Sequence, residues 1–172
     1  MSGFQAILGT SEAPLPWTTL VLGGARSGKS RLGERLIRDH AVDVTPVYLA
    51  TAEAFDAEMR LRINQHQNDR GTDWTTLEAP RDLPDQLDAC GDRPVLVDCL
   101  TLWLSNLMLA DMAMDQEIAN LVDVLAERTA PTVLVSNEVG LGLVPETPLG
   151  RQVRDRQGAT QQRVAPRRPF ER

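Results

Sequence analysis

The chain has 172 residues, a length that suits one domain, and its 42% hydrophobic and 24% charged residues are ordinary for a soluble globular protein. Its formal net charge of −6 excludes general nucleic-acid binding, which needs a basic face. No apolar stretch approaches the roughly 20 residues that span a membrane. Its two cysteines have neither metal-binding spacing nor a disulfide framework. We therefore expect a cytoplasmic protein that meets any phosphate through a local cationic site.

The N-terminal part of the chain contains the clearest motif. Residues 1–16 lack the regions of a signal peptide and are predicted to be a flexible extension, followed by one domain at 17–172. The apolar run 20–22 predicts a strand, and the apolar spacing of 31–38 predicts a helix. Between them stands a match to G-x-x-x-x-G-K-[ST], the sequence Gly23-Gly24-Ala25-Arg26-Ser27-Gly28-Lys29-Ser30. Strand, loop and helix follow in the order that a phosphate-binding P-loop requires.

This P-loop has a defined chemistry. Its glycines permit a backbone path that turns consecutive N–H groups toward an anion at the positive end of the following helix. Lys29 is predicted to reach the β- and γ-phosphates, and the Ser30 hydroxyl to bind Mg²⁺. Lys29 is also the only lysine among 18 lysines and arginines. The alternative, a glycine-rich turn that matches by chance, is disfavoured by the flanking strand and helix.

Apolar runs and helical patterns then alternate along the chain. We predict further strands at 47–50, 73–78, 95–98 and 132–138. We predict helices at 56–68, around 83–87, at 102–112, at 115–128 and from about 149. Strands that alternate with helices imply crossover connections, a mostly parallel sheet and a ligand site at the carboxyl ends of the strands. The predicted fold is therefore α/β, a RecA-like P-loop NTPase sheet flanked by helices.

Asp98 is the strongest acidic candidate. It ends the apolar run 95–98, the position from which an acidic residue of a P-loop protein holds Mg²⁺ directly or through water. Its alternative use is to cap the helix that follows, and the two uses are compatible. Together with Lys29 and Ser30, Asp98 predicts binding of a nucleoside triphosphate with Mg²⁺.

The two histidines are interpreted differently. His40 lies near the end of the first predicted helix, where an imidazole interacts with the helix dipole, and we interpret it as structural. His66 lies four residues from both Arg62 and Arg70, so on a helix the three side chains share one face. Two cations favour the neutral imidazole, the form that can attack phosphorus. Spacing alone leaves open whether His66 is a nucleophile or part of a solvated polar face.

Several runs match one known family in order and spacing. They are the P-loop, Tyr48-Leu49-Ala50-Thr51-Ala52, the segment Asp56-Ala57-Glu58-Met59 with Arg62-Ile63 and His66, and Asn137-Glu138-Val139-Gly140-Leu141-Gly142-Leu143-Val144-Pro145-Glu146. The P-loop occurs in many families, whereas the last two runs are far more specific. From residue 19 to about 165 the chain thereby resembles the bifunctional adenosylcobinamide kinase and adenosylcobinamide-phosphate guanylyltransferase of cobalamin biosynthesis.

The resemblance implies two reactions at overlapping nucleotide sites. In the first, the γ-phosphoryl group of ATP or GTP passes to the aminopropanol hydroxyl of adenosylcobinamide. In the second, His66 attacks the α-phosphorus of GTP and releases pyrophosphate, and the resulting guanylyl-histidine is attacked by adenosylcobinamide phosphate to give adenosylcobinamide-GDP. The resemblance also implies a homo-oligomer, a trimer.

Site residues follow from the same resemblance. It makes His66 catalytic, beside Lys29 of the P-loop, and it adds to the motif-based prediction that Ser30 and Asp98 are the ligands of Mg²⁺. Nucleotide binding is assigned to the whole P-loop and to Ala50, Thr51, Ala52, Gln67, Asn68, Asp69, Arg70, Glu78 and Asp98.

The match fails at the C-terminus. Gln161 stands where the family has asparagine, and the last ten residues hold two prolines and four arginines instead of an apolar strand. We therefore expect that the family's C-terminal strand is missing and that the sequence from about 166 is truncated or frame-shifted. Two other functions stay open, namely a single-function P-loop kinase of small molecules and an NTP-driven regulatory module.

Overall fold

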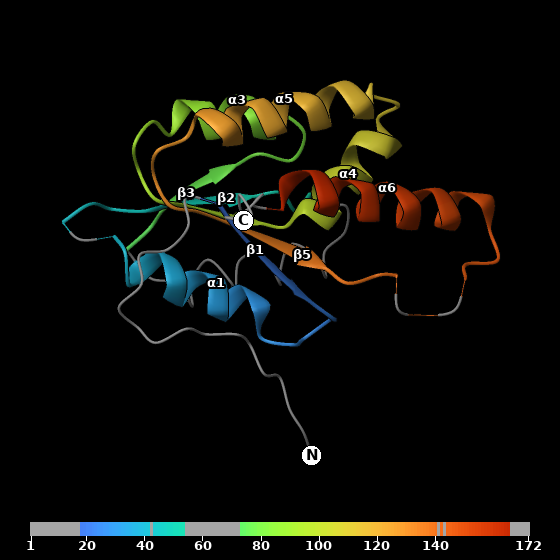
Figure 1. The fold of residues 1–172 in the computed structure, drawn as a ribbon, viewed down its shortest axis with the longest axis horizontal. Helices are drawn as coiled ribbons and strands as arrows, with labels where there is room; N and C mark the ends of the chain where they lie inside the picture. The colour runs from blue at the N-terminus through green and yellow to red at the C-terminus, as the bar shows by residue number, and fades with distance from the viewer. Residues whose placement is uncertain (1–17, 42, 54–72, 141, 143, 166–172) are drawn as a thin grey trace, which may run out of the picture.

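The computed structural model describes residues 18–41, 43–53, 73–140, 142 and 144–165. The predicted extension at 1–16 and the predicted helix at 56–68 lie outside this part of the chain. Within it, the strands form one five-stranded sheet in the order β1-β5-β4-β2-β3, and every pairing is parallel. Helices cover both faces of the sheet (Figure 1). The predicted α/β fold with a parallel sheet is confirmed.

The strands are short and follow the predicted apolar runs. They are β1 (Thr18–Gly23), β2 (Val47–Ala50), β3 (Thr75–Glu78), β4 (Val95–Asp98) and β5 (Thr132–Asn137). The runs predicted at 73–78 and 132–138 were therefore too long by one or two residues. Strand β4, which ends in Asp98, is separated from the P-loop strand β1 by β5 alone.

The helices differ from the predictions at their ends. They are α1 (Lys29–Arg38), α3 (Leu83–Ala89), α4 (Leu100–Leu109), α5 (Met114–Glu127) and α6 (Pro148–Val164). Helix α1 begins two residues before the predicted start because Gly28 of the P-loop is already its N-cap. Helix α4 begins at Leu100 rather than Leu102 and ends at Leu109 rather than Met112.

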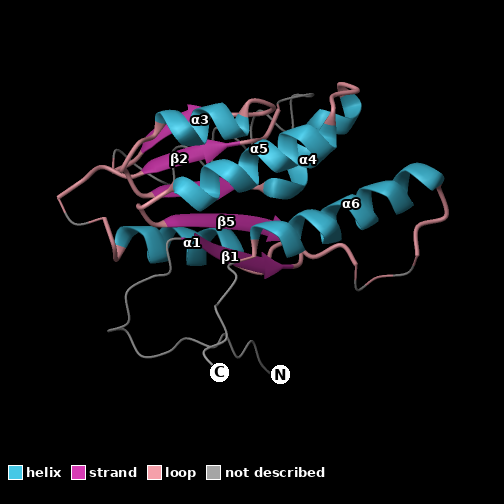
Figure 2. Ribbon diagram, turned by 45° about the horizontal axis from the view of Figure 1, so that its top comes forward, coloured by secondary structure: helices cyan, strands magenta, loops and turns pink. Residues whose placement is uncertain are grey.

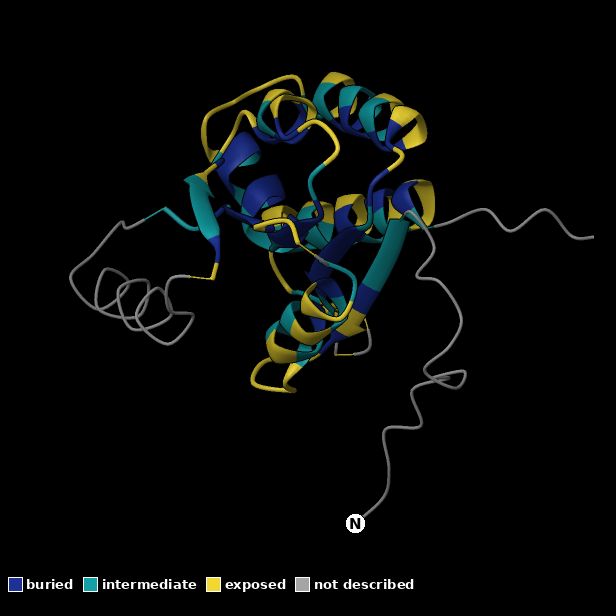
Figure 3. Ribbon diagram, turned by 90° about the vertical axis from the view of Figure 1, so that its left-hand side faces the viewer, coloured by how far each residue is buried: buried dark blue, intermediate teal, exposed yellow. Residues whose placement is uncertain are grey.

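The sheet separates two apolar cores. Helix α1 packs on one face, and α3, α4, α5 and α6 lie on the other (Figures 1 and 2). Because side chains alternate along a strand, Val95 and Val97 of β4 enter the core of the four-helix face, whereas Leu96 enters the core under α1. The inner strands β2, β4 and β5 are almost wholly buried between these layers, whereas the edge strands β1 and β3 are mostly of intermediate burial (Figure 3).

A close approach of α1 to the sheet sets the geometry of the site. A Cβ atom on Gly33 would lie 2.8 Å from Leu96 Cδ1 and 3.3 Å from Val135 Cγ2, so glycine permits this packing distance. Helix α1 therefore crosses directly over β4 and β5. Since α1 follows the carboxyl end of β1, its first residues, Lys29 and Ser30, lie toward the carboxyl edge of the sheet.

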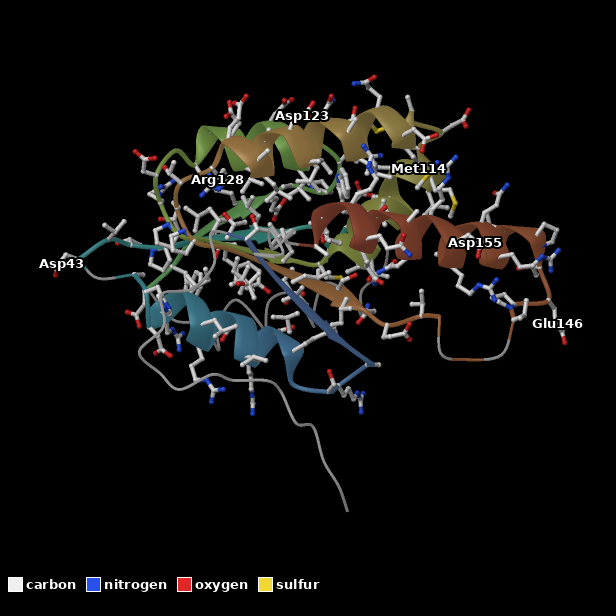
Figure 4. The ribbon with its side chains drawn as sticks, viewed as in Figure 1. Asp43, Met114, Asp123, Arg128, Glu146 and Asp155 are labelled. Atoms are coloured by element: carbon white, nitrogen blue, oxygen red, sulfur yellow. The ribbon has the colours of Figure 1, made fainter. Side chains whose placement is uncertain are left out.

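At the amino edge of the sheet, the buried guanidinium of Arg128 joins four chain segments. It donates hydrogen bonds to Thr132 Oγ1 (2.8 Å) and to the carbonyl oxygens of Leu87 (3.0 Å), Gly91 (2.9 Å) and Arg93 (2.8 Å). Burial lowers the pKa of Arg128 below its ordinary value, which still leaves an arginine charged at neutral pH. In Figure 4, Arg128 lies at the end of the molecule opposite Glu146. It therefore supports the fold away from the P-loop.

Replacing Arg128 by methionine is expected to lower the free energy of unfolding by about 3 kcal/mol. Methionine keeps the apolar stem but leaves the carbonyl oxygens of Leu87, Gly91 and Arg93, which are buried or partly buried, without this donor. Urea unfolding at an unchanged m-value measures the loss. The matched control is Arg35→Met on the exposed side of α1, where we expect a change within about 0.5 kcal/mol. Equal effects of the two substitutions would contradict this role of Arg128.

Candidate nucleotide site at the P-loop and the strand ends

The P-loop forms a turn closed by its own backbone. The Ser27 N–H donates to the Gly24 carbonyl at 3.3 Å, and the Leu32 N–H donates to the Gly28 carbonyl at 3.0 Å. Gly28 has a φ of +86°, a left-handed conformation that side chains other than glycine's rarely tolerate. The consensus glycine before Lys29 is thus required by the backbone. The predicted strand, loop and helix are all present.

The N-terminus of α1 is built to receive an anion. Its N-cap, Gly28, has no side chain to occupy the free N–H groups, and its first turn carries no acidic residue. Lys29 Nζ donates to the Gly24 carbonyl at 3.1 Å, so the only lysine of the chain folds back over the loop. Residues 24–28 are exposed. Helix dipole, open amides and ammonium group together favour a phosphate at this place.

The other predicted residues that the structure describes meet along the same edge. Ala50 of β2 pairs with Asp98 of β4 on one side and with Glu78 of β3 on the other. Gly23, the first P-loop residue, pairs with Asn137 at the end of β5. Glu78 is exposed, as expected for a strand-end carboxylate. The carboxyl ends of all the strands in this sheet therefore form one line, with the P-loop at its β1 end.

The alternative use of Asp98, as the cap of the following helix, is not found in the structure. Cys99 occupies the N-cap position of α4 and makes no side-chain capping bond. The Asp98 carboxylate instead accepts a hydrogen bond from the Tyr48 hydroxyl, with Oη and Oδ2 2.7 Å apart. Because this bond turns the carboxylate toward β2, Asp98 does not cap the N–H groups of the helix.

Thr51 and Asn106 fix the segments that follow β2 and β3. The buried Thr51 hydroxyl accepts from the Cys99 N–H at 2.7 Å and donates to the Cys99 carbonyl at 2.8 Å. Asn106 Nδ2 donates to the carbonyls of Thr51 (2.8 Å) and Pro80 (3.0 Å). The Thr51 hydroxyl is thus committed to the Cys99 backbone. Its N–H donates to the Asp98 carbonyl at 3.1 Å, and Thr51 is fully buried, so its polar groups hold the strand ends together.

An ion pair links the segments that follow β2 and β3. Arg81 Nη2 lies 2.8 Å from Glu53 Oε1, and Trp103 Nε1 donates to the Arg81 carbonyl at 3.0 Å. Glu53 follows β2 and Arg81 follows β3, so the pair joins the two strand ends across the edge of the sheet. The sequence offered no signal for this contact, because neither residue belongs to the P-loop or ends a predicted strand.

A buried polar cluster attaches α6 to the other end of the site. Gln157 Nε2 lies 2.7 Å from Thr101 Oγ1 and 2.6 Å from Ser136 Oγ, with the Asn137 carbonyl at 3.1 Å. Gln161 Nε2 also donates to Ser136 Oγ and to the Asn137 carbonyl, each at 3.1 Å. The next N–H along the chain after Asn137, that of Glu138, donates to the Gly23 carbonyl at 3.0 Å. Helix α6 is therefore linked to the first residue of the P-loop.

The cysteines and His40 behave as predicted. Burial, followed by the negative charge of Asp98, raises the pKa of Cys99 to about 11, so its thiol stays protonated at neutral pH. Burial also raises the pKa of Cys90. The Nδ1–H of His40 donates to the Leu36 carbonyl at 2.9 Å, within the last turns of α1. Neither cysteine is suited to act as a nucleophile, and His40 has a structural contact.

The remaining predicted residues lie outside the described part of the chain. They are His66, Gln67, Asn68, Asp69 and Arg70. The two predicted metal ligands are described, and both offer the oxygen donors that Mg²⁺ prefers. Among the described residues, no three His, Cys, Asp or Glu side chains converge on a metal position. The donor set fits a cation that takes its other ligands from nucleotide phosphates and water, as Mg²⁺ commonly does.

Comparisons with known proteins agree with this arrangement. Residues 19–168 match the family described as cobinamide kinase / cobinamide phosphate guanyltransferase. The chain is 47% identical over 152 residues to the bifunctional adenosylcobalamin biosynthesis protein CobP of Pseudomonas aeruginosa, covering 86% of this chain and 87% of that protein. It is 40% identical over 163 residues to the bifunctional protein CobU of Salmonella typhimurium, covering 85% and 88%.

A third relative, the CobU protein of Escherichia coli, is 36% identical over 163 residues with the same coverage of 85% and 88%. Within the described residues, no helix combines the length and the apolar character needed to cross a membrane. The family match spans β1 from its second residue, the P-loop, β2 to β5 and α6. The chain therefore belongs to the cobinamide kinase / cobinamide phosphate guanyltransferase family.

Proposed function

We propose that this chain catalyses the two reactions after which its family is named. It phosphorylates adenosylcobinamide with ATP or GTP, and it transfers GMP from GTP to the resulting phosphate to give adenosylcobinamide-GDP. The observation that carries the proposal is the P-loop, whose open amides and Lys29 ammonium group face the same sheet edge as Asp98. A family match over 19–168 supports the choice of substrates.

In the kinase reaction, the protein positions the triphosphate and neutralises its charge. The P-loop amides hold the phosphate oxygens, and Lys29 shifts from the Gly24 carbonyl to the β- and γ-phosphates. Ser30 and Asp98 would hold Mg²⁺, which supplies charge neutralisation when it is bound. Ala50, Ala52 and Glu78 stand at the adjoining strand ends and complete the proposed nucleotide contacts.

In the guanylyl transfer, a neutral imidazole nitrogen of His66 attacks the α-phosphorus of GTP. A nitrogen–phosphorus bond forms, the bond from the α-phosphorus to the bridging oxygen breaks, and pyrophosphate leaves with that electron pair. A phosphate oxygen of adenosylcobinamide phosphate then attacks the same phosphorus and expels the imidazole. Residues 67–70, which include the basic Arg70, follow His66 in the sequence and are proposed to bind the same nucleotide.

We also propose a cellular location and an oligomeric state for the enzyme. We infer a cytoplasmic enzyme, because its nucleotide substrates are cytoplasmic, and a homotrimer, which the family resemblance implies. Exposed apolar side chains on and near α4 and α6, Leu109, Val144 and Leu149, offer surface for such an assembly. The mass in solution decides this point, since a trimer has three times the 19.0 kDa of one chain.

Labelled nucleotides test the proposed function. With α-labelled GTP and Mg²⁺, the protein is expected to acquire an acid-labile covalent label that adenosylcobinamide phosphate removes. With γ-labelled ATP or GTP, the label is expected to appear in adenosylcobinamide phosphate. A folded protein that transfers only the γ-phosphate would be a single-function kinase. Hydrolysis without transfer to either acceptor would instead favour the NTP-driven regulatory module.

A further inference from the structure

Tyr48, whose hydroxyl bonds the Asp98 carboxylate, is held in a rigid position. Tyr48, the only tyrosine of the chain, is 5% exposed in β2. Its ring meets the Trp74 ring edge to face, with centroids 5.9 Å apart and planes at 87°. The Arg38 guanidinium carbon lies 5.9 Å from the centroid of the Trp74 ring. A ring packed in this way has little freedom, so the position of its hydroxyl is fixed by the fold.

Strand pairing explains how the Tyr48 hydroxyl reaches the carboxylate. Tyr48 pairs with Leu96 across the β2 and β4 ladder, and Asp98 follows two residues later on the same face of β4. Leu96 packs directly beneath Gly33 of α1. The Asp98 side chain therefore lies on the face that α1 covers, displaced from Leu96 toward the carboxyl edge of the sheet. That is the direction in which Ser30 begins α1.

We propose that Tyr48 is a positioning residue that fixes the Asp98 carboxylate for Mg²⁺ at the P-loop. The proposal rests on the proposed role of Asp98. The hydroxyl donates to Oδ2 at 2.7 Å and thereby sets the plane of the carboxylate. The other oxygen, Oδ1, is then presented to the cation or to a water bound to it. Hydrogen-bond partners of metal ligands commonly contribute about 10- to 100-fold to metal affinity.

A simpler role would be to satisfy a half-buried carboxylate without any effect on the cation. The two roles differ in what they predict for Tyr48→Phe, which keeps the ring and its packing against Trp74. Loss of a merely structural bond lowers stability and affects nucleotide binding equally with and without Mg²⁺. Loss of the positioning bond weakens binding only when Mg²⁺ is present, because Asp98 touches the nucleotide through the cation.

The experiment measures nucleotide affinity by titration calorimetry on the full chain. The probe is a GTP analogue whose α,β-bridging oxygen is replaced by methylene, which prevents transfer. For Tyr48→Phe we expect affinity in Mg²⁺ to fall about 10-fold, and affinity in EDTA to stay within about twofold. Trp74→Phe keeps the Tyr48 hydroxyl and loosens only the ring packing around it, so we expect a smaller loss of affinity in Mg²⁺ than for Tyr48→Phe. An equal loss in both media, or no loss in Mg²⁺, overturns the proposal.

A double-mutant cycle separates this proposal from the role of Asp98 itself. Asp98→Asn is expected to lower affinity in Mg²⁺, and Tyr48→Phe is expected to add nothing in that background. If Asp98→Asn leaves the Mg²⁺ dependence unchanged, the proposed metal role of Asp98 fails, and the role of Tyr48 fails with it. If Asp98→Asn weakens binding while Tyr48→Phe does not, only the positioning role is wrong. Melting temperatures verify that each variant is folded.

Discussion

Alanine in place of Lys29 is expected to lower both the kinase rate and the guanylyl transfer rate by at least about 100-fold. The P-loop amides remain in this variant, but the only ammonium group at the anion site is removed. The charge that develops on the leaving phosphates then loses its ammonium partner at short range. Initial rates with each labelled nucleotide measure the effect, and Arg31→Ala, an exposed neighbour on α1, is the matched control.

The composition of the chain gives a second measurement of the same residue. Because Lys29 is the only lysine, an amine-directed acylating reagent can modify only Lys29 and the N-terminal amine. We expect bound nucleotide to protect Lys29 from acylation, as measured by peptide mapping. Protection does not depend on catalysis, so it reports the binding role alone. Equal acylation with and without saturating nucleotide would show that the ammonium group does not contact the phosphates.

The replacement of His66 by alanine is expected to abolish the covalent label from α-labelled GTP. No other group in the proposed mechanism forms the bond to phosphorus, so the amount of label on the protein should fall below the detection limit of the assay. His40→Ala is the matched control, since the chain has just two histidines and His40 bonds the Leu36 carbonyl. That variant is expected to keep its label.

The kinase reaction distinguishes loss of the nucleophile from loss of the fold. The proposed γ-phosphoryl transfer uses Lys29, Ser30 and Asp98, so His66→Ala is expected to phosphorylate adenosylcobinamide at a rate within about tenfold of the wild type. Retained labelling in His66→Ala would place the covalent bond on another residue. Loss of both activities would show instead that His66 is needed for nucleotide binding as a whole.

Local signals predicted much of this fold. The P-loop motif and the apolar runs 47–50 and 95–98 identified β1, β2 and β4 because a buried parallel strand reads as a continuous apolar segment. Helix ends were predicted less well. Helix α4 starts at Leu100, two residues after Asp98, whose carboxylate bonds Tyr48, a residue 50 positions away in the chain. Periodicity within a helix carries no information about such a partner.

The same reason explains which parts of the site were missed. Asn106, Arg81 and Gln157 act on segments that only the completed fold brings near them. The burial of Asn106 could have been suspected from its place on an apolar helix. Gln157 lies on α6, whose sequence is mostly polar, and nothing in that pattern indicates that one glutamine is 1% exposed.

Hydrogen bonds to the end of β5 restrict the position of α6 along its own axis. The buried residues of this helix are Gln157, Thr160 and Val164, so polar side chains provide much of its attachment. Apolar contacts tolerate sliding by a fraction of a turn, whereas hydrogen bonds are lost within about 0.5 Å of displacement. Both glutamines reach the Asn137 carbonyl, whose strand end pairs with Gly23. A shift of α6 along its axis would therefore displace Gly23, the first residue of the P-loop.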